Sequence, residues 1–240
     1  MENQVAQLLQ GAYKVPPAPK SKQRHPQSDP KESFRRKLTQ CQYCMKAKLQ
    51  GVTFFRCNAC KIDIYCSKEC QKASWPSHKE KCRLNRQELE SGENVADMGA
   101  KLRAFTSKHR PTIAQAGVRA LELYKDINRA RTHILRIDLR SRPGSRRPET
   151  LFYLVNAEVT PLSEFEPGMR ANMESQLEVA REQNIRSGHG MIGALFVMLT
   201  SVETRVSNIA PVGFDNSVRG LRPGNWREAL TKLLNEGIVR

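Results

Sequence analysis

Apolar side chains in residues 87–124 recur mostly at three- and four-residue steps, a spacing that places them along one face of a helix. The first series consists of Leu89, Val95, Met98, Leu102 and Phe105. We therefore expect a helix from about residue 87 to about Lys108. A second helix is expected after Pro111, because proline lacks the backbone N–H that a helix interior needs.

Three later segments have the composition of strands: residues 133–139, 151–159 and 191–202. The last is apolar over most of its length, which suits a buried strand or a buried helix, and we favour the strand. Helices are predicted for residues 167–186 and, at the end of the chain, for residues 226–234. Together these elements predict that residues 87–240 form a small α+β domain.

The first 38 residues differ from the rest in composition. They hold five prolines among Lys, Gln, Ser and Arg, with hardly any apolar periodicity. Residues 1–38 are therefore predicted to be a disordered, basic, proline-rich tail. Within them, Val15-Pro-Pro-Ala-Pro19 is either a plain linker or a segment able to occupy a peptide groove of the same chain or to bind another copy.

Length and composition set broad limits. The 240 residues suffice for one or two domains, and a hydrophobic content of 39% makes any core modest. The first residues lack the basic region and apolar run of a secretory leader. The longest apolar stretch is shorter than the roughly 20 residues of a membrane helix. These features predict an intracellular protein, of the nucleus or the cytoplasm, without a membrane partner.

The strongest chemical feature is a cluster of seven cysteines and one histidine with the spacing C-x2-C-x12-C-x2-C-x5-C-x3-C-x7-H-x3-C. The cluster consists of Cys41, Cys44, Cys57, Cys60, Cys66, Cys70, His78 and Cys82. An odd number of thiols cannot all pair as disulfides, and a reducing compartment leaves thiols available to metals. Eight such ligands suffice for two tetrahedral zinc ions.

The spacing also predicts local structure around the ligands. Short strands are expected at residues 52–55 and 61–65. Ser67 can cap a short helix that carries Cys70. His78 and Cys82 are four residues apart, so they share one face of a second helical segment, whose first turn tolerates Pro76. Spacing alone leaves open whether the ligand pairs bind zinc in sequential or in alternating order.

The string C-x2-C … C-x2-C-x4-Tyr-Cys-Ser-x2-Cys-Gln-x3-Trp-x2-His-Lys-x2-Cys resembles the MYND-type zinc finger. The resemblance extends from Cys41 to Cys82, about a sixth of the chain, and predicts a finger of short hairpins and short helices over residues 39–84. It implies that alternate pairs share a metal. One zinc ion would then be held by Cys41, Cys44, Cys66 and Cys70, and the other by Cys57, Cys60, His78 and Cys82.

The same resemblance implies what the finger does. Sites with four protein ligands have no open position, so both zinc ions are expected to be structural. MYND fingers bind short proline-containing segments of partner proteins, and Gln71 and Trp75 match the family's peptide-contact positions. The alternative is that Trp75 only covers the second zinc site. The finger-first layout is similar to that of stand-alone MYND proteins of fungi. The resemblance extends the expected docking role to proteins that act in transcriptional regulation.

Nucleic-acid binding is the alternative function. The formal charge of the chain is +16, and four arginines stand close together at Arg140, Arg142, Arg146 and Arg147. Seven thiolates and two Zn²⁺ ions contribute −7 + 4 = −3, which lowers the net charge to about +13. No base-reading helix pattern accompanies these arginines. We therefore favour protein docking over nucleic acid.

An enzymatic function is not expected. Some methyltransferases carry a MYND finger inside a SET domain, but no Asn-His-Ser-Cys-type motif and no second cysteine cluster follow this finger. Residues 188–193 match the dinucleotide fingerprint G-x-G-x-x-G. That fingerprint requires a preceding strand and a following helix, whereas here a predicted helix precedes it and a predicted strand follows.

Overall fold

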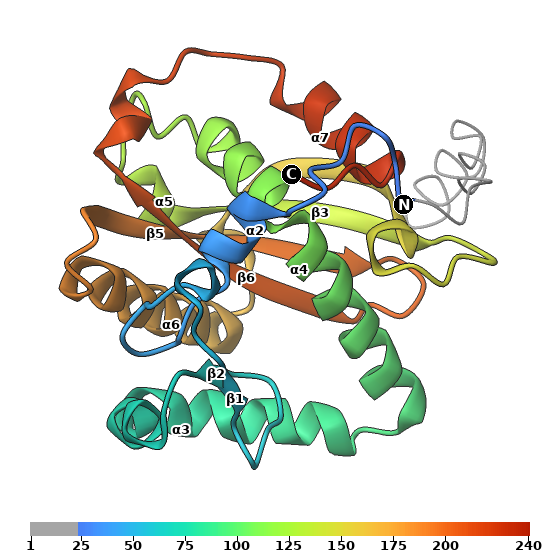
Figure 1. The fold of residues 1–240 in the computed structure, drawn as a ribbon. Coiled ribbons are helices and arrows are strands. Elements are labelled where there is room, and N and C mark those ends of the chain that lie inside the picture. Colours follow the sequence, from blue (N-terminus) through green and yellow to red (C-terminus); the bar gives the residue numbers. More distant parts are fainter. Residues whose placement is uncertain (1–23) are drawn as a thin grey trace.

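The computed structural model describes residues 24–240 (Figure 1). Residues 1–23, including the Val15–Pro19 segment, lie outside the described part. The described chain consists of a small finger followed by a larger region of helices and one four-stranded sheet.

The larger region is built on strands β3 (His133–Ser141), β4 (Phe152–Pro161), β5 (Met191–Ser201) and β6 (Ser207–Asp215). Their spatial order is β4-β3-β5-β6. The central pair β3 and β5 runs parallel, whereas β4 and β6 are antiparallel to their neighbours. Each outer strand is therefore a hairpin partner of a central one, and α6 (Pro167–Arg186) makes the crossover from β4 to β5.

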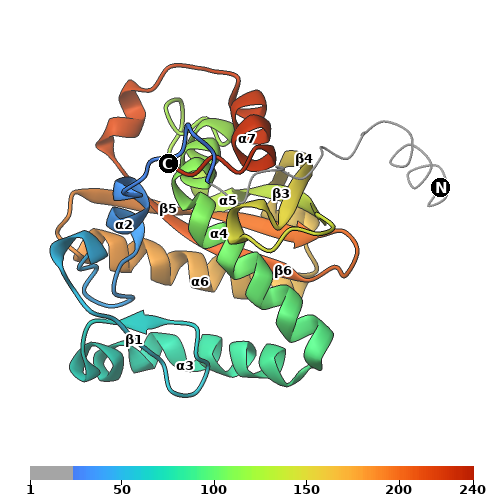
Figure 2. The ribbon, with the colours of Figure 1, turned by 45° about the vertical axis from the view of Figure 1, so that its right-hand side comes forward.

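Helices cover both faces of this sheet (Figure 2). Side chains of β5 alternate between the faces, as expected for a strand buried on both sides. Leu195, Val197 and Leu199 join the core beneath α4 (Glu93–Ala120) and α7 (Trp226–Asn235). The intervening residues of β5 pack with Met173 and Leu177 of α6. The sheet thus lies between two helical layers.

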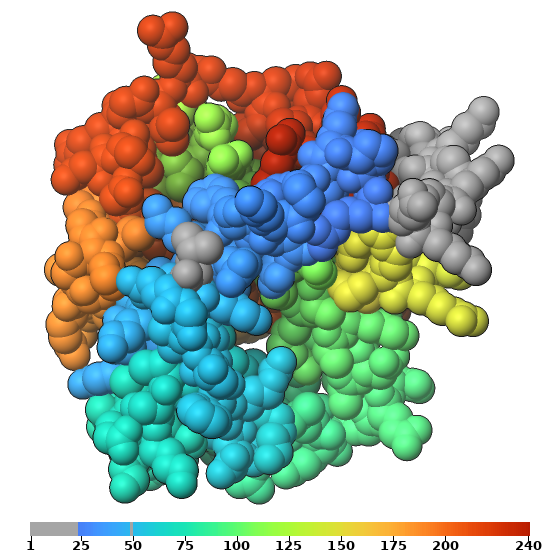
Figure 3. Space-filling model, in the orientation of Figure 1, coloured from blue at the N-terminus to red at the C-terminus, as the bar shows by residue number. Residues whose placement is uncertain are grey.

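The finger lies beside this region, next to α6 and the beginning of α4 (Figures 1 and 3). It contains a hairpin of two-residue strands, β1 (Phe55–Arg56) and β2 (Ile64–Tyr65), and a 3₁₀ turn at Lys48–Gln50. The long helix α3 (Lys68–Glu90) follows. In this helix Ser77 accepts a hydrogen bond from Gln183 of α6 at 3.3 Å, so the finger contacts the larger region directly.

Several predicted elements match the structure. The strands expected at residues 133–139, 151–159 and 191–202 correspond to β3, β4 and β5, and the helix expected at 167–186 is α6. The terminal helix is α7. Shorter elements connect them: α5 (Arg129–Thr132) and the 3₁₀ turns Pro148–Thr150, Leu162–Glu164 and Asn216–Gly220.

The prediction was wrong about where the helices divide. Two short helices were expected around Cys70 and His78, but α3 is one helix of 23 residues that contains Pro76 and runs past the predicted finger boundary at residue 84. A break was expected near Pro111, but Pro111 lies inside α4. A proline inside a helix costs about 3 kcal/mol. Phe105 and Ile113, on either side of Pro111, are fully buried in one core, which offsets that cost.

The predicted tail is also wrong for residues 24–38, which are folded against the larger region. Ser33–Leu38 forms helix α2. The backbone N–H of Asp29 donates to the carbonyl of Val239 at 2.8 Å, and the Val239 N–H donates to the Ser28 hydroxyl at 3.0 Å. Glu32 is buried and forms ion pairs with Arg24, Arg35 and Lys108. Composition alone missed this folding because the contacts with Val239 and Lys108 join residues far apart in sequence.

Candidate metal centre

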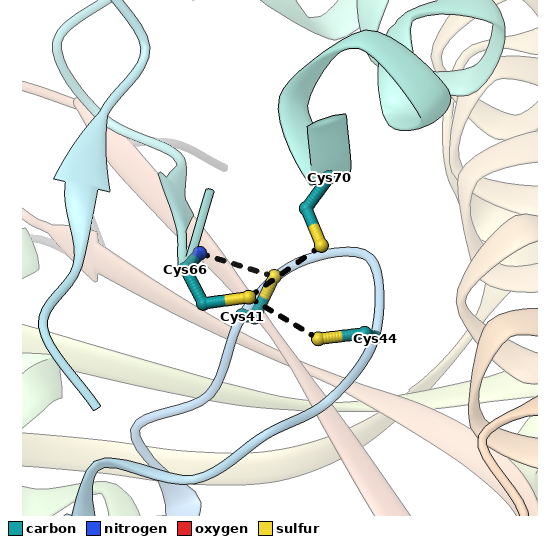
Figure 4. A group of neighbouring side chains, drawn as sticks. All are labelled: Cys41, Cys44, Cys66 and Cys70. Carbon is teal, nitrogen blue, oxygen red and sulfur yellow. Dashed lines mark hydrogen bonds between the residues drawn. The ribbon is translucent and has the colours of Figure 1, made fainter. Parts of the chain in front are cut away.

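The first cluster joins two loops to the start of α3. Cys41 and Cys44 belong to the turn before the hairpin, Cys66 directly follows β2, and Cys70 lies in the first turn of α3. Their sulfur atoms point toward one another (Figure 4). The Sγ of Cys66 lies 3.4 Å from the Sγ of Cys44 and 3.5 Å from that of Cys70. The Cys66 N–H donates to the Cys41 Sγ at 3.4 Å, which helps hold a thiolate there.

The second cluster joins the turn after β1 to the middle of α3. Cys57 and Cys60 come from this turn, and His78 and Cys82 come from one face of the helix. The Sγ atoms of Cys57 and Cys82 are 3.9 Å apart, and the Cys60 Sγ lies 3.8 Å from the His78 Nε2. All four residues are buried, whereas in the first cluster only Cys41 is.

Both clusters fit zinc. Within each cluster the four ligand atoms all lie within 4.8 Å of one another. A zinc ion with Zn–S bonds of about 2.3 Å in tetrahedral geometry holds its sulfur ligands about 3.8 Å apart. The two ligand sets are the alternating ones that the MYND resemblance implies, so the chain binds two zinc ions in a cross-braced arrangement.

Helix α3 carries ligands for both metals, and a cap fixes the residue at which the helix begins. Ser67 is its N-cap, and its hydroxyl accepts a hydrogen bond from the Cys70 N–H at 3.1 Å. Ser74, His78 and Cys82 follow at four-residue steps and are the buried residues of the helix. The Ser74 hydroxyl lies 3.3 Å from the hydroxyl of Tyr65, a fully buried side chain between the hairpin and α3.

A further residue, Asp63, orients the histidine ligand. Its Oδ2 lies 3.0 Å from the His78 Nδ1, and its Oδ1 lies 2.9 Å from the Lys81 Nζ. Burial would raise the pKa of this carboxyl, but the close contact with the His78 ring and the charge of Lys81 outweigh it and lower the pKa to about 2. Such a carboxylate fixes the ring so that Nε2 faces the metal. Sequence reasoning missed Asp63, although its place between two ligand pairs was a usable indication.

Gln71 and Trp75 lie beside the second cluster and line a groove of about 490 Å³ between α3 and the hairpin. Phe55 forms the opposite apolar wall. The Gln71 Nε2 donates to the Cys57 Sγ at 3.8 Å, and the Trp75 ring meets the His78 ring edge-on at 6.0 Å between centroids. Trp75 therefore covers a zinc ligand and still leaves 45% of its surface exposed.

The other candidate sites from the sequence do not form in the described residues. Arg142 is buried and donates to the Asn235 carbonyl at 2.8 Å, and Arg147 forms an ion pair with Glu149, so the four arginines are not one exposed patch. The glycine motif at residues 188–193 connects α6 to β5, the reverse of a nucleotide-binding turn.

His109 is a core residue. Its Nε2 lies 2.9 Å from the Glu149 carbonyl, and burial lowers its pKa to about 4, so it is neutral at pH 7. In residues 24–240, no helix has both the length and the apolar character that crossing a bilayer requires.

Comparison with known proteins agrees with this geometry. The family model described as the MYND finger matches residues 41–82. A SET and MYND domain-containing protein of Dictyostelium discoideum is 43% identical over 47 residues, which are 18% of this chain and 9% of that protein. The N-lysine methyltransferase SMYD2 of Homo sapiens is 45% identical over 42 residues, again 18% of this chain and 9% of the relative.

A third relative, Dauer abnormal formation protein 25 of Caenorhabditis elegans, is 41% identical over 58 residues, 23% of this chain and 14% of its own length. The chain therefore matches only a small part of each of these relatives, and the matching segment is the finger. No solved structure matches the chain significantly. The finger is a zinc-binding MYND module, and the likeness does not extend to the sheet region.

Proposed function

We propose that the finger docks proline-containing segments of partner proteins in the groove between α3 and β1. The observation that carries the proposal is the pair of exposed aromatic walls, Trp75 at 45% and Phe55 at 58% exposure. Large apolar side chains that face solvent across a groove are typical of binding sites. A proline ring packs well on the flat face of an indole, which gives Trp75 a role beyond covering His78.

The hairpin supports the same proposal through its backbone. In an antiparallel pair, residues alternate between bonding the partner strand and facing away from it. Cys57 donates to the Asp63 carbonyl at 2.8 Å, so Arg56, its neighbour, directs its N–H and C=O away from β2. Strand β1 pairs only with β2 among the described strands. Its other edge can therefore add an extended peptide.

The proposal is for a binding module and not for an enzyme. The methyltransferase activity named for SMYD2 belongs to a protein that this chain matches only over the finger. In the finger itself each zinc ion has four protein ligands, so neither offers a position for a substrate or a water nucleophile.

Substitution of Trp75 tests the docking role. The probe is an array of fluorescent 12-residue peptides with one to three prolines, measured against the full chain. We expect Trp75→Ala to weaken the binding peptides about 30-fold, the loss of roughly 2 kcal/mol typical of a central aromatic contact. Tyr43→Ala is the matched control, because Tyr43 is a 43% exposed aromatic of the finger that does not line the groove.

Zinc content must be measured alongside binding. Unchanged affinities in Trp75→Ala, with two zinc ions retained, would show that the indole only shields the metal site. An equal loss in Tyr43→Ala would contradict the proposed location of the groove.

A further inference from the structure

The docking groove has a charge of one sign along its rim. Three cationic residues line it, Arg56 on the hairpin and Lys68 and Lys72 on α3, and no carboxylate does. All three are exposed. In residues 24–240 none of them forms an ion pair within 4.0 Å. A site with exposed cations and apolar walls favours a ligand that is apolar in one part and anionic in another.

The positions of the cations are set by the helix. Gln71, Lys72 and Trp75 lie three, four and seven residues after Lys68, so the four side chains share one face of α3. Lys68 is the first residue of the helix, where unpaired backbone N–H groups add positive potential. On the opposite wall, the Arg56 guanidinium donates to the Lys61 carbonyl at 3.0 Å, which fixes its position.

The helical rise gives the spacing of ligand groups. Lys72 and Lys68 precede Trp75 by three and seven residues, which corresponds to about 4.5 and 10.5 Å along the axis. An extended or polyproline segment advances about 3.1–3.4 Å per residue. A carboxylate about two or three residues from a proline on Trp75 therefore reaches the lysines.

Nearby negative charges weaken this potential without filling the groove. Glu69 interacts with the charges of Lys68 and Lys72, but it points from a different side of the helix and does not line the groove. Four thiolates and Zn²⁺ give the first cluster a charge of −2, and three thiolates, a neutral histidine and Zn²⁺ give the second −1. If the lysines served only to balance these clusters, their removal would lower zinc retention and leave peptide choice unchanged.

We infer that the groove selects proline-containing peptides that carry acidic residues two or three positions from the proline. This inference rests on the proposed docking function and names its partner class. It also bears on the chain's own Val15–Pro19, which has Lys14, Lys20 and Lys22 as neighbours and no acidic residue among residues 3–28. The lysines beside this segment have the same charge as the cations that line the groove, so the segment is a poor occupant of the groove. Docking therefore takes place between molecules.

The test compares three peptides with the common core Val-Pro-Pro-Ala-Pro and flanks of aspartate, serine or lysine. Fluorescence polarisation with the full chain is measured at 50 and 300 mM NaCl. Two or three exposed charge pairs predict that the aspartate peptide binds about 5- to 30-fold more tightly than the lysine peptide at low salt. The difference should shrink at high salt because the charges are screened.

Paired variants identify the cations responsible. Lys68→Gln with Lys72→Gln should remove most of the difference between the aspartate and lysine peptides and leave two zinc ions bound. Lys46→Gln with Lys48→Gln removes the same charge from exposed finger positions outside the groove and should preserve the difference.

The outcomes separate the two proposals. Equal affinities for the three peptides, all lost in Trp75→Ala, would overturn the charge preference and leave docking intact. No binding, or binding that ignores Trp75, would overturn docking itself. A further competitor is a single-stranded 12-nucleotide DNA. If it displaces the aspartate peptide at a lower concentration than the unlabelled peptide does, and if this displacement requires Lys68 and Lys72, the surface is assigned to nucleic acid.

Discussion

Asp63 shows how one carboxylate can set the affinity of a metal site that it does not touch. It contacts the far nitrogen of His78 and the ammonium group of Lys81, and it is buried between the hairpin and α3. A hydrogen-bonded carboxylate makes a histidine a better ligand and fixes its tautomer, with Nε2 left for zinc. The second site therefore depends on a residue outside the eight ligands.

We predict that Asp63→Asn weakens zinc binding at the second site about 10- to 100-fold and leaves the first site unchanged. The measurement is competition with a chromogenic chelator, which should resolve one weakened and one unaltered ion. Glu80→Gln is the control, because Glu80 is an exposed acidic residue of α3, the helix that carries His78, and it pairs with Arg83. Equal weakening of both ions in Asp63→Asn would refute a local effect.

At the residue scale the sequence predicted the ligands but not their support. Thiols at these spacings have few uses other than metal binding, so the eight ligands could be read directly. The position of Asp63 between two ligand pairs hinted at a role, but its contact with His78 joins the residue before β2 to a helix residue 15 positions later, and the spacing of the ligands does not specify that pairing. The same holds for the hydrogen bond from Gln71 to Cys57, which gives a residue of the groove a second role at the metal.

At the element scale, predictions succeeded where one periodic pattern filled one element. Helix α6 was predicted at its observed bounds, and β5 to within one residue at its end. Strand β6 was missed because Pro211 and Gly213 interrupt it, although Ala210, Val212 and Phe214 alternate inward as a strand requires. Proline is accepted there because β6 is an edge strand.

The long helices were divided wrongly for a related reason. Proline was taken as a break at residue 111, and residues 67–82 were taken as two segments, but tertiary contacts outweigh local preference at both places. In α3 the ligands Cys70, His78 and Cys82 lie on both sides of Pro76 and bind two metals, which holds the helix continuous. Metal binding adds energy that helix propensities do not include.

The close approach of α4 to the sheet gives a prediction at this scale. A Cβ on Gly117 would lie 2.8 Å from the Leu195 Cδ1 and 3.1 Å from the Val197 Cγ2. Gly117→Val should therefore lower the free energy of unfolding by about 1–3 kcal/mol through overpacking. Gly168→Ala, in α6 with nothing within 4 Å of its Cβ position, should be neutral or slightly stabilising. Urea unfolding of both variants is the measurement, and an unaffected Gly117→Val would contradict the packing described.

At the scale of the whole molecule, the finger and the sheet region are more closely joined than composition suggested. Helix α3 extends beyond the last ligand to Glu90 and packs with α4, where Arg103 pairs with Glu88 at 2.6 Å. Residues 24–38 contact both the C-terminal residues and α4. Domain limits drawn from the sequence at residues 38 and 84 followed changes in composition, which do not record such long-range contacts.

Zinc nevertheless remains the main source of order in the finger. The hairpin has only two residues in each strand, and its buried cluster consists of cysteines around Tyr65 with a few partly buried apolar side chains. A core of this size cannot hold a fold, whereas structural zinc contributes about 10–16 kcal/mol per site in finger peptides. The groove walls, one on the hairpin and one on α3, are therefore positioned by the metals.

Native mass spectrometry of the full chain tests this account most directly. The wild type should carry two zinc ions, and Cys57→Ala should carry one, because it removes a ligand of the second site and none of the first. One ion or none in the wild type, or two ions retained in Cys57→Ala, would contradict the two closed four-ligand sites.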